Sequence, residues 1–195
     1  MHAKITGVIL AGGQATRMGG EDKGLIQIGG KALYQYTLAR LKPQVGNVLI
    51  SANRNLDEYR RSGLPVISDL SAGFAGPLAG MLAGLQYATT DWVVFVPCDV
   101  PDFPDTLVAH LWRGKHGALA AYASDGERAH PTLALLHNSL APRLVDYLAR
   151  GERKLMHFLN EVDGKQIEFV DRPSAFHNLN TPDDCLNWQR KRDHQ

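Results

Sequence analysis

The sequence predicts an α/β fold built around a doubly wound, mostly parallel β-sheet. Short β-rich runs alternate with helical patterns over the first hundred residues, which is typical of parallel sheets. The almost continuous apolar run Trp92–Pro97 has the character of a central strand that is buried on both faces. After residue 115 the alternation is less regular. We therefore expect a Rossmann-like, three-layer α/β/α arrangement with a mixed C-terminal edge.

The individual elements follow from local composition. The expected strands are Ile5–Leu10, Asn47–Ser51, Val66–Ser68, Trp92–Pro97, Ala118–Ala123, Thr132–Leu136 and Ile167–Val170. The expected helices are Leu33–Lys42, Leu56–Arg61, Leu78–Ala88, Pro104–Arg113, Leu140–Ala149, Arg153–Asn160 and Pro182–Gln189. The last helix has the strongest start signal, with Thr181 as N-cap, Pro182 as first residue, and Asp183 and Asp184 in the first turn.

Three glycines mark the helix expected at 78–88. Gly76, Gly80 and Gly84 recur every four residues, so one helix face is nearly bare backbone. We expect that face to pack closely on the sheet.

Size and composition limit the classes of function. The 195 residues are about right for one domain, 1–195, and a net charge of +1 leaves no broad basic surface for nucleic acid. Cys98 and Cys185 form no metal-binding pattern and are typical of thiols in a reducing cytoplasm. Residues 70–90 carry no charge but contain too little Leu, Ile and Val for a membrane span. We expect a cytoplasmic protein without membrane contact.

A long loop follows the first strand. Residues 11–24 contain five glycines and two cations, Arg17 and Lys23. Glycine lets the backbone approach a ligand closely, and successive backbone N–H groups can cradle phosphate. The loop matches neither the Walker A pattern nor G-x-G-x-x-G. It predicts a polyphosphate site in which Arg17 and Lys23 neutralise charge.

Polar residues follow the other early strands: Ser51 and Asn53 the second, Asp69 the third and Asp99 the fourth. Because ligands of open α/β sheets bind beyond the carboxyl ends of the strands, these residues describe one site.

Asp99 has a particular setting in this group. It lies between Pro97 and Pro101, which restrict the backbone and fix the direction of the carboxylate. A single fixed carboxylate that faces phosphates is a suitable ligand for Mg²⁺.

The loop LAGGQATRMGGEDKGL, residues 10–25, resembles the signature of nucleotidyltransferases, and specifically of the molybdenum cofactor guanylyltransferase family. The resemblance spans essentially the whole chain through GPLAG at 76–80, PCDVP at 97–101, DGERAHPTLAL at 125–135, GERKLM at 151–156 and NLNTPDD at 178–184. It implies an enzyme that transfers GMP from GTP to the terminal phosphate of molybdopterin, releasing pyrophosphate, with Mg²⁺ as cofactor.

The resemblance also implies residue roles. The catalytic residues would be Arg17, Lys23 and Asp99, with Asp99 the metal ligand. The nucleotide-binding residues would be Leu10, Ala11, Gly12, Gly13, Lys23, Ser51, Asn53, Asp69, Gly80 and Asp99. The acceptor-binding residues would be Arg128, His130, Arg153, Lys154, Asn178 and Asn180. Residues 1–100 would form a nucleotide-binding half and 101–195 an acceptor-binding half. In one departure, the family often has Asn where this chain has Ser51.

Several acceptor residues also have simpler interpretations. The 178–184 block doubles as a helix start, Arg153 and Lys154 could flank a helix N-terminus, and His130 could be a hydrogen-bonded turn histidine.

Other functions stay open at this level. The enzyme could be a cytidylyl- or uridylyltransferase that acts on the same cofactor or on a sugar or polyol phosphate. A carboxylate at Asp69 favours guanine, because guanine offers N1–H and N2–H₂ donors that cytosine lacks. A non-catalytic nucleotide-binding regulatory module is the second alternative. Protein partners could include other cofactor-biosynthesis proteins and apo-molybdoenzymes or their chaperones.

Overall fold

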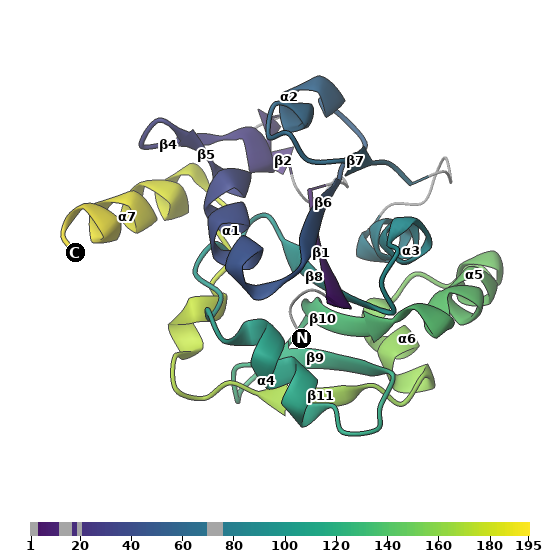
Figure 1. The fold of residues 1–195 in the computed structure, drawn as a ribbon. Helices are drawn as coiled ribbons and strands as arrows, with labels where there is room; N and C mark the ends of the chain where they lie inside the picture. The colour runs from purple at the N-terminus through teal and green to yellow at the C-terminus, as the bar shows by residue number, and fades with distance from the viewer. Residues whose placement is uncertain (1–3, 12–16, 19–20, 70–75) are drawn as a thin grey trace.

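The computed structural model describes residues 4–11, 17–18, 21–69 and 76–195 (Figure 1). The predictions for Gly12 and Gly13 lie outside these residues. For Arg17 only the backbone is described.

The described residues form a seven-stranded central sheet. Its strands are β1 (Ile5–Leu10), β6 (Asn47–Ser51), β7 (Val66–Ile67), β8 (Trp92–Pro97), β9 (Ala120–Ser124), β10 (Ala129–His137) and β11 (Lys165–Glu168). They are arranged in the order β11-β9-β10-β8-β1-β6-β7, which places β8 in the middle as predicted. All neighbours pair in parallel except β10, which is antiparallel to β8 and β9. The mostly parallel sheet with a mixed C-terminal edge is confirmed.

Two antiparallel pairs of two-residue strands were not predicted. β2 (Arg17–Met18) pairs with β3 (Glu21–Asp22), and β4 (Gln27–Ile28) pairs with β5 (Lys31–Ala32). A strand of two residues is too short to show the alternation of polar and apolar residues on which strand prediction depends.

Helices cover both faces of the sheet (Figure 1). The α-helices are α1 (Leu33–Leu41), α2 (Leu56–Arg60), α3 (Pro77–Tyr87), α4 (Leu107–Gly114), α5 (Ala141–Ala149), α6 (Leu155–Glu161) and α7 (Pro182–Asp193). The 3₁₀ turns are η3 (Lys23–Leu25), η4 (Lys42–Gln44), η5 (Asn138–Leu140) and η6 (Pro173–Phe176). Buried residues of α1, α2 and α4 share one apolar cluster, and those of α3, α5 and α6 share another. These clusters are the two interfaces of the predicted three-layer arrangement. None of the helices in the described residues is long and apolar enough to cross a bilayer.

A third, smaller cluster fixes α7. Cys185 and Trp188 of α7 pack with Ile28 of β4 and with Leu33 and Leu179. The C-terminal helix is thereby docked beside the N-terminal half of the chain rather than beside β11, which precedes it in sequence (Figure 1).

Several element bounds and local details differ from the prediction, among them the bounds of β10, β11 and α7, and two of the differences have a clear physical reason. α4 begins at Leu107 instead of Pro104, because the Pro104 carbonyl accepts from the Leu107 N–H and closes a separate turn. The prediction that three glycines of α3 pack closely on the sheet is correct for Gly80 and Gly84 and wrong for Gly76. A Cβ on Gly80 would lie 2.9 Å from Ser51 Oγ and one on Gly84 2.8 Å from Phe95 Cε1, but one on Gly76 would meet no described atom within 4 Å. Gly76 instead precedes the helix with φ of 116°, a conformation that favours glycine.

Candidate active site

The carboxyl ends of β8, β1, β6 and β7 lie at one edge of the sheet because these four strands are parallel neighbours. Backbone hydrogen bonds continue past the strand ends, from Ala11 N to Ser51 O (2.8 Å) and from Cys98 N to Leu10 O (3.2 Å). Leu10, Ala11 and Ser51 are buried there. The predicted convergence of these strand ends is therefore confirmed, and close packing of Gly80 brings α3 against the Ser51 hydroxyl.

Asp69 and Asn53 meet at the outer part of this edge. The Asp69 N–H donates to Asn53 Oδ1 at 3.2 Å. Burial raises the pKa of the Asp69 carboxyl, and its hydrogen bond with Asn53 opposes that shift. Asp69 and Ser68 also line a cavity of about 290 Å³ whose far wall is formed by α3 and Leu148. A carboxylate thus lies at the rim of a partly apolar recess.

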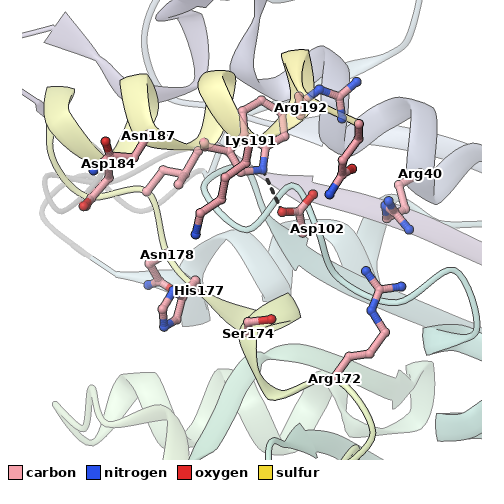
Figure 2. Close-up of a pocket in the computed structure, with 13 residues that line it drawn as sticks. Arg40, Asp102, Arg172, Ser174, His177, Asn178, Asp184, Asn187, Lys191 and Arg192 are labelled. Atoms are coloured by element: carbon pink, nitrogen blue, oxygen red, sulfur yellow. Dashed lines mark hydrogen bonds between the residues drawn. The ribbon is translucent and has the colours of Figure 1, made fainter.

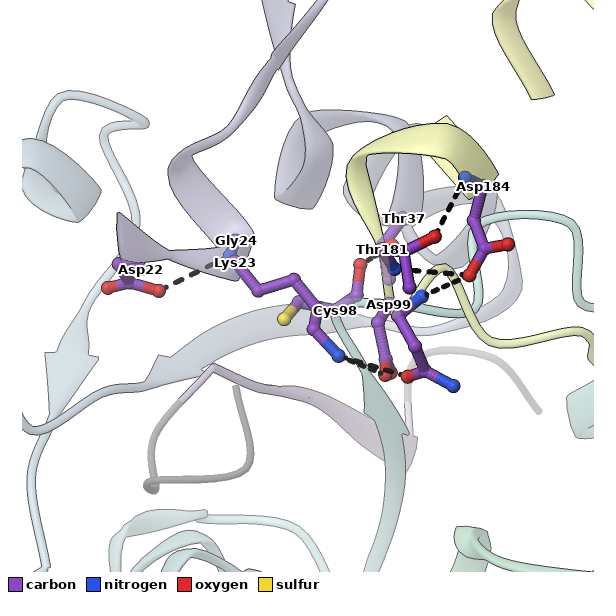
Figure 3. A network of polar contacts seen from close by, with 9 residues as sticks. Asp22, Lys23, Gly24, Thr37, Cys98, Asp99, Thr181 and Asp184 are labelled. Carbon is purple, nitrogen blue, oxygen red and sulfur yellow. Dashed lines mark hydrogen bonds and ion pairs between the residues drawn. The ribbon is translucent and has the colours of Figure 1, made fainter. Parts of the chain in front are cut away.

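Lys23 is the centre of the site (Figure 3). Its side chain is only 4% exposed, and its ammonium donates to Asp99 Oδ2 at 3.2 Å and to Asn180 Oδ1 at 3.1 Å. Leu179 N also donates to the Asp99 carbonyl at 2.8 Å, which holds the Asn180 segment beside the end of β8. One residue of the predicted nucleotide set and one of the predicted acceptor set therefore contact the same ammonium group.

A buried carboxylate next to Lys23 holds the backbone of the loop. Asp22 Oδ1 accepts from Tyr59 Oη at 2.8 Å and from Gly24 N at 3.2 Å, and Asp22 Oδ2 accepts from Asn55 Nδ2 at 3.3 Å. Burial raises the pKa of Tyr59 strongly, so the phenol stays protonated and donates. Neither Asp22 nor Tyr59 was predicted from the sequence as part of the site. The sequence Asp22-Lys23-Gly24 places a carboxylate next to the predicted phosphate-binding lysine. Nothing in the sequence indicates that Tyr59 would contact that carboxylate.

Asp99 follows the end of the central strand β8, as the sequence predicted. The preceding Cys98 is fully buried, which raises the pKa of its thiol, and the Cys98 carbonyl accepts from Thr37 Oγ1 at 3.2 Å. The Asp99 side chain is 13% exposed and accordingly reaches solvent.

The donor set fits a phosphate-bound cation better than a metal held by protein alone. The described residues contain no cluster of three or more His, Cys, Asp or Glu that could hold a metal. Asp99 offers one carboxylate, and its partner in the structure is the Lys23 ammonium, so the position already accommodates a cation. Mg²⁺ commonly binds one or two carboxylates and takes its other ligands from phosphates and water. Asp99 fits that pattern.

His130 lies at the start of β10. Its Nε2 is 2.8 Å from Asp125 Oδ2, and its ring stacks on Phe176 with centroids 5.1 Å apart. The other Asp125 oxygen accepts from the backbone N–H groups of Glu127 and Arg128 at 2.9 Å each, and these bonds, led by the one to His130, lower the pKa of Asp125. His130 is thus a hydrogen-bonded turn histidine. The side chain of Arg128 is exposed beside it.

Arg153 and Lys154 directly precede α6, with Lys154 at its N-cap. Arg153 Nη1 donates to the carbonyls of Leu148 and Glu152, at 3.2 and 2.7 Å, and the Lys154 carbonyl accepts from Tyr147 Oη at 2.7 Å. These contacts match the helix-flanking interpretation. An acceptor-binding role for both residues stays a prediction.

The helix start at Thr181 is confirmed. Thr181 Oγ1 accepts from Asp184 N at 3.1 Å, while Asp184 Oδ2 accepts from the N–H groups of Asn180 and Thr181 at 2.9 and 3.1 Å. These N–H donors lower the pKa of Asp184. Asn180 donates its backbone N–H to Asp184 at the helix start and accepts from Lys23 through its side chain, so the structural and functional interpretations do not exclude each other. Asn178, two residues before Asn180, is exposed.

Comparison with known proteins agrees with this geometry. The family described as "MobA-like NTP transferase domain" matches residues 7–165. A molybdenum cofactor guanylyltransferase of Serratia proteamaculans (strain 568) is 68% identical over 192 residues, covering 98% of both chains. One of Yersinia pseudotuberculosis serotype O:1b (strain IP 31758) is 59% identical with the same coverage.

Solved structures share the fold. Molybdopterin-guanine dinucleotide biosynthesis protein A from Archaeoglobus fulgidus superimposes with a TM-score of 0.79 at 23% identity, covering 97% of this chain and 100% of that one. A CMP:2-keto-3-deoxy-manno-octonic acid synthetase complexed with CTP gives 0.76 at 14% identity, covering 98% and 99%. Similarity at these identities concerns the fold alone, whereas the relatives at 59–68% identity define the family. The chain belongs to the MobA-like NTP transferases and, among them, to the molybdenum cofactor guanylyltransferases.

Proposed function

We propose that this protein transfers GMP from GTP to the terminal phosphate of molybdopterin, forming the guanine dinucleotide cofactor and releasing pyrophosphate. The observation that carries the proposal is the contact of Lys23 with both Asp99 and Asn180. It puts a buried cation, a fixed carboxylate and the predicted acceptor segment at one point of the ligand-binding edge. Family membership at 68% identity supports the choice of substrates.

The reaction needs no catalytic base. A phosphomonoester has a second pKa of about 6, so the attacking phosphate is already largely dianionic near neutral pH. One of its oxygens forms a bond to the α-phosphorus of GTP, and the bond from that phosphorus to the β-phosphate oxygen breaks. The protein has to bring two anions together and stabilise the departing pyrophosphate, which is a task of positioning and electrostatics.

Lys23 is suited to this task. An ammonium group has three N–H donors, and Asp99 and Asn180 accept from two of them. The third is left for a phosphate oxygen of the nucleotide. Burial of the side chain strengthens this interaction because the surroundings screen charge less than water does. We propose that Arg17 adds a second cation to the same phosphates.

A divalent cation, which we propose to be Mg²⁺, would be held by Asp99 and by phosphate oxygens. When bound, it neutralises phosphate charge and acts as a Lewis acid. Asp99 contributes a carboxylate whose direction is set by the end of β8 and by the backbone contacts of Cys98 and Leu179.

Base selection is assigned to Asp69. As a carboxylate it accepts from the N1–H and N2–H₂ groups of guanine, and Asn53 holds its backbone in place. A site built on hydrogen bonds rejects a base that lacks the matching donors far better than an apolar pocket does. GTP is therefore expected to be used in preference to CTP, UTP and ATP.

The chain is proposed to work as one domain, 1–195, with nucleotide contacts mainly from residues 1–100 and acceptor contacts mainly from 101–195. The acceptor contacts would come from Arg128, His130, Arg153, Lys154, Asn178 and Asn180. We further propose a cytoplasmic location and transient contacts with other cofactor-biosynthesis proteins and with apo-molybdoenzymes or their chaperones.

The test is to measure pyrophosphate release with GTP, CTP, UTP or ATP, each with and without molybdopterin. Release that requires both GTP and molybdopterin is the expected result. Equal or faster release with CTP would assign the protein to cytidylyl transfer. Nucleotide binding without release under any condition would indicate a regulatory module.

A further inference from the structure

A second cavity, with mostly polar walls, lies between η6, the segment that follows it and α7 (Figure 2). Its volume is about 400 Å³, within the roughly 300–1,000 Å³ of small-molecule sites. Residues from well-separated parts of the sequence line it, between Arg40 on α1 and Gln195 after α7.

Among the charged residues that line this cavity, cations outnumber carboxylates. Arg40 comes from α1, Arg172 precedes η6, and Lys191 lies on α7. Within the described part of the chain, none of these three side chains has an ion-pair or hydrogen-bond partner. Figure 2 shows the Lys191 and Arg172 side chains extending into the space between α7 and η6. A fourth cation, Arg192, instead stacks on neighbouring aromatic rings.

The two carboxylates in the wall offset only part of this positive charge. Asp102 Oδ2 accepts from Trp188 Nε1 at 2.7 Å, and Asp184 accepts from the backbone at the start of α7. Both are fixed by these contacts, and four cations face two carboxylates. Since the whole chain carries only +1, this excess is a local feature.

Unpaired cations that share one cavity repel each other, and an oxyanion bound between them would offset that repulsion. Guanidinium groups match phosphate oxygens in pairs, and the hydroxyl of Ser174 and the amide of Asn178 add neutral donors. A volume of about 400 Å³ is of the size that a small ligand fills.

We propose that this cavity is an oxyanion-binding site for a small ligand with phosphate-class chemistry, separate from the Lys23–Asp99 centre. The two sites share the segment 178–180. Asn178 and Leu179 line the cavity, while the Leu179 N–H donates to the Asp99 carbonyl and Asn180 accepts from Lys23. The ligand is either an anionic group of the acceptor away from its reacting phosphate, an identity that rests on the proposed function, or free phosphate or pyrophosphate.

The test uses inorganic pyrophosphate as the probe, titrated calorimetrically into the full chain at low salt. The variants are Arg172→Ser/Lys191→Ser and a control with the same loss of charge, Arg113→Ser/Lys165→Ser, whose side chains are exposed elsewhere. Both are compared in the Lys23→Ala background, which removes the principal cation of the transfer centre. We expect the cavity variant to weaken binding at least about tenfold and the control less than twofold, with melting temperatures unchanged.

Equal weakening by the two double variants, or complete loss of binding in Lys23→Ala alone, would overturn the proposal.

Adding molybdopterin to the Lys23→Ala protein identifies the source of the ligand. Displacement of pyrophosphate assigns the cavity to the acceptor, and simultaneous binding assigns it to free phosphate compounds. GTP titration of Arg172→Ser/Lys191→Ser in a chain that retains Lys23 keeps the two proposals apart, because GTP binding depends on Lys23 and Asp69 and should be unchanged. If pyrophosphate release from GTP failed in the unaltered protein, the cavity result would still hold.

Discussion

Lys23 and Asn180 lie 157 positions apart in the chain, and their side chains are joined by a hydrogen bond of 3.1 Å. The family resemblance assigns them to different substrates, the nucleotide and the acceptor. Because they contact each other directly, any ligand that moves the Lys23 ammonium also changes the surroundings of Asn180. The two substrates are thus expected to influence each other's binding through this contact.

Despite this contact, Lys23→Ala and Asn180→Ala should weaken the binding of different substrates. Lys23→Ala removes the buried cation, so GTP affinity should fall strongly. Asn180→Ala removes a side-chain amide that would contact the acceptor, and a hydrogen bond to a charged group contributes about 1.5–3 kcal/mol, or one to two decades of molybdopterin affinity. GTP affinity should change only a few-fold, because the Lys23 ammonium keeps Asp99 as its partner. Calorimetric titration of each ligand measures both effects.

Stability separates the functional interpretation of Asn180 from the structural one. Asn180 contributes to the α7 start through its backbone N–H, which Asn180→Ala retains, so the melting temperature should stay close to that of the unaltered protein. Asn160→Ala, at an exposed position of α6, is the control. A marked drop in melting temperature, together with normal molybdopterin affinity of the folded fraction, would make the 178–184 block structural.

Asp99→Asn should abolish turnover while the protein stays folded. The amide oxygen of Asn can still accept from Lys23, but it is a poor ligand for a divalent cation. Loss of a Lewis acid that contributes several kcal/mol predicts a fall in kcat of at least about a hundredfold. Asp105→Asn, at an exposed position before α4, should be neutral. Near-normal rates of Asp99→Asn at saturating Mg²⁺ would remove Asp99 from the metal role.

The sheet and its binding edge could be predicted because they depend on local patterns. The run Trp92–Pro97 is apolar enough to identify a central strand, and parallel neighbours place their carboxyl ends together. Thr181 was identified as a helix cap for the same reason, since capping depends on residues three positions apart.

The contacts that complete the site could not be predicted in this way. Asp22 binds Tyr59 across 37 positions, and Lys23 binds Asn180 across 157. Such pairs depend on how α2 and α7 pack, and the spacing of residues along the chain does not indicate this packing. The cations of the second cavity are likewise scattered in sequence and gather only when α7 docks beside α1.

GTP binding should depend on pH through Asp69. Burial raises the pKa of this carboxyl above its ordinary value of 3.8, and guanine needs the ionised form. GTP affinity should therefore fall as the pH drops through the raised pKa, at a higher pH than an ordinary Asp would give. The effect on folding has the opposite sign. The folded state binds the proton more tightly than the unfolded chain, so the stability from Asp69 is present at low pH and is lost as the pH rises through the raised pKa.

Asp69→Asn tests both parts of this prediction. The variant should lose the acid limb of the GTP-binding profile and much of the preference for GTP over CTP in kcat/KM. Affinity titrations over the acidic range, with Asp171→Asn as an exposed control, measure it. An unchanged pH profile in Asp69→Asn would assign the titration to another group.

Gly24 and Tyr59 should show strong coupling in stability. A Cβ on Gly24 would lie 2.5 Å from Tyr59 Oη, which is itself fixed by Asp22, so Gly24→Ala forces a buried ring to move. Overpacking of this kind costs about 1–3 kcal/mol of unfolding free energy. Tyr59→Phe removes the oxygen in question, and the next ring atom lies 3.4 Å from the added Cβ. It also removes a donor from the buried Asp22 carboxylate and so has a cost of its own.

The double variant Gly24→Ala/Tyr59→Phe should consequently lose less stability than the sum of the two single changes, by about 0.5–3 kcal/mol. Gly117→Ala is the control, since a Cβ there would meet no described atom within 4 Å. Urea unfolding of the unaltered protein, the two single variants and the double variant gives the coupling free energy. GTP titration of the same proteins shows whether a loss of stability at Gly24 and Tyr59 is accompanied by a loss of GTP affinity, as expected if these residues position Lys23. Additive losses would mean that the loop backbone shifts to accommodate the methyl group, and Asp22 and Tyr59 would then not fix Lys23.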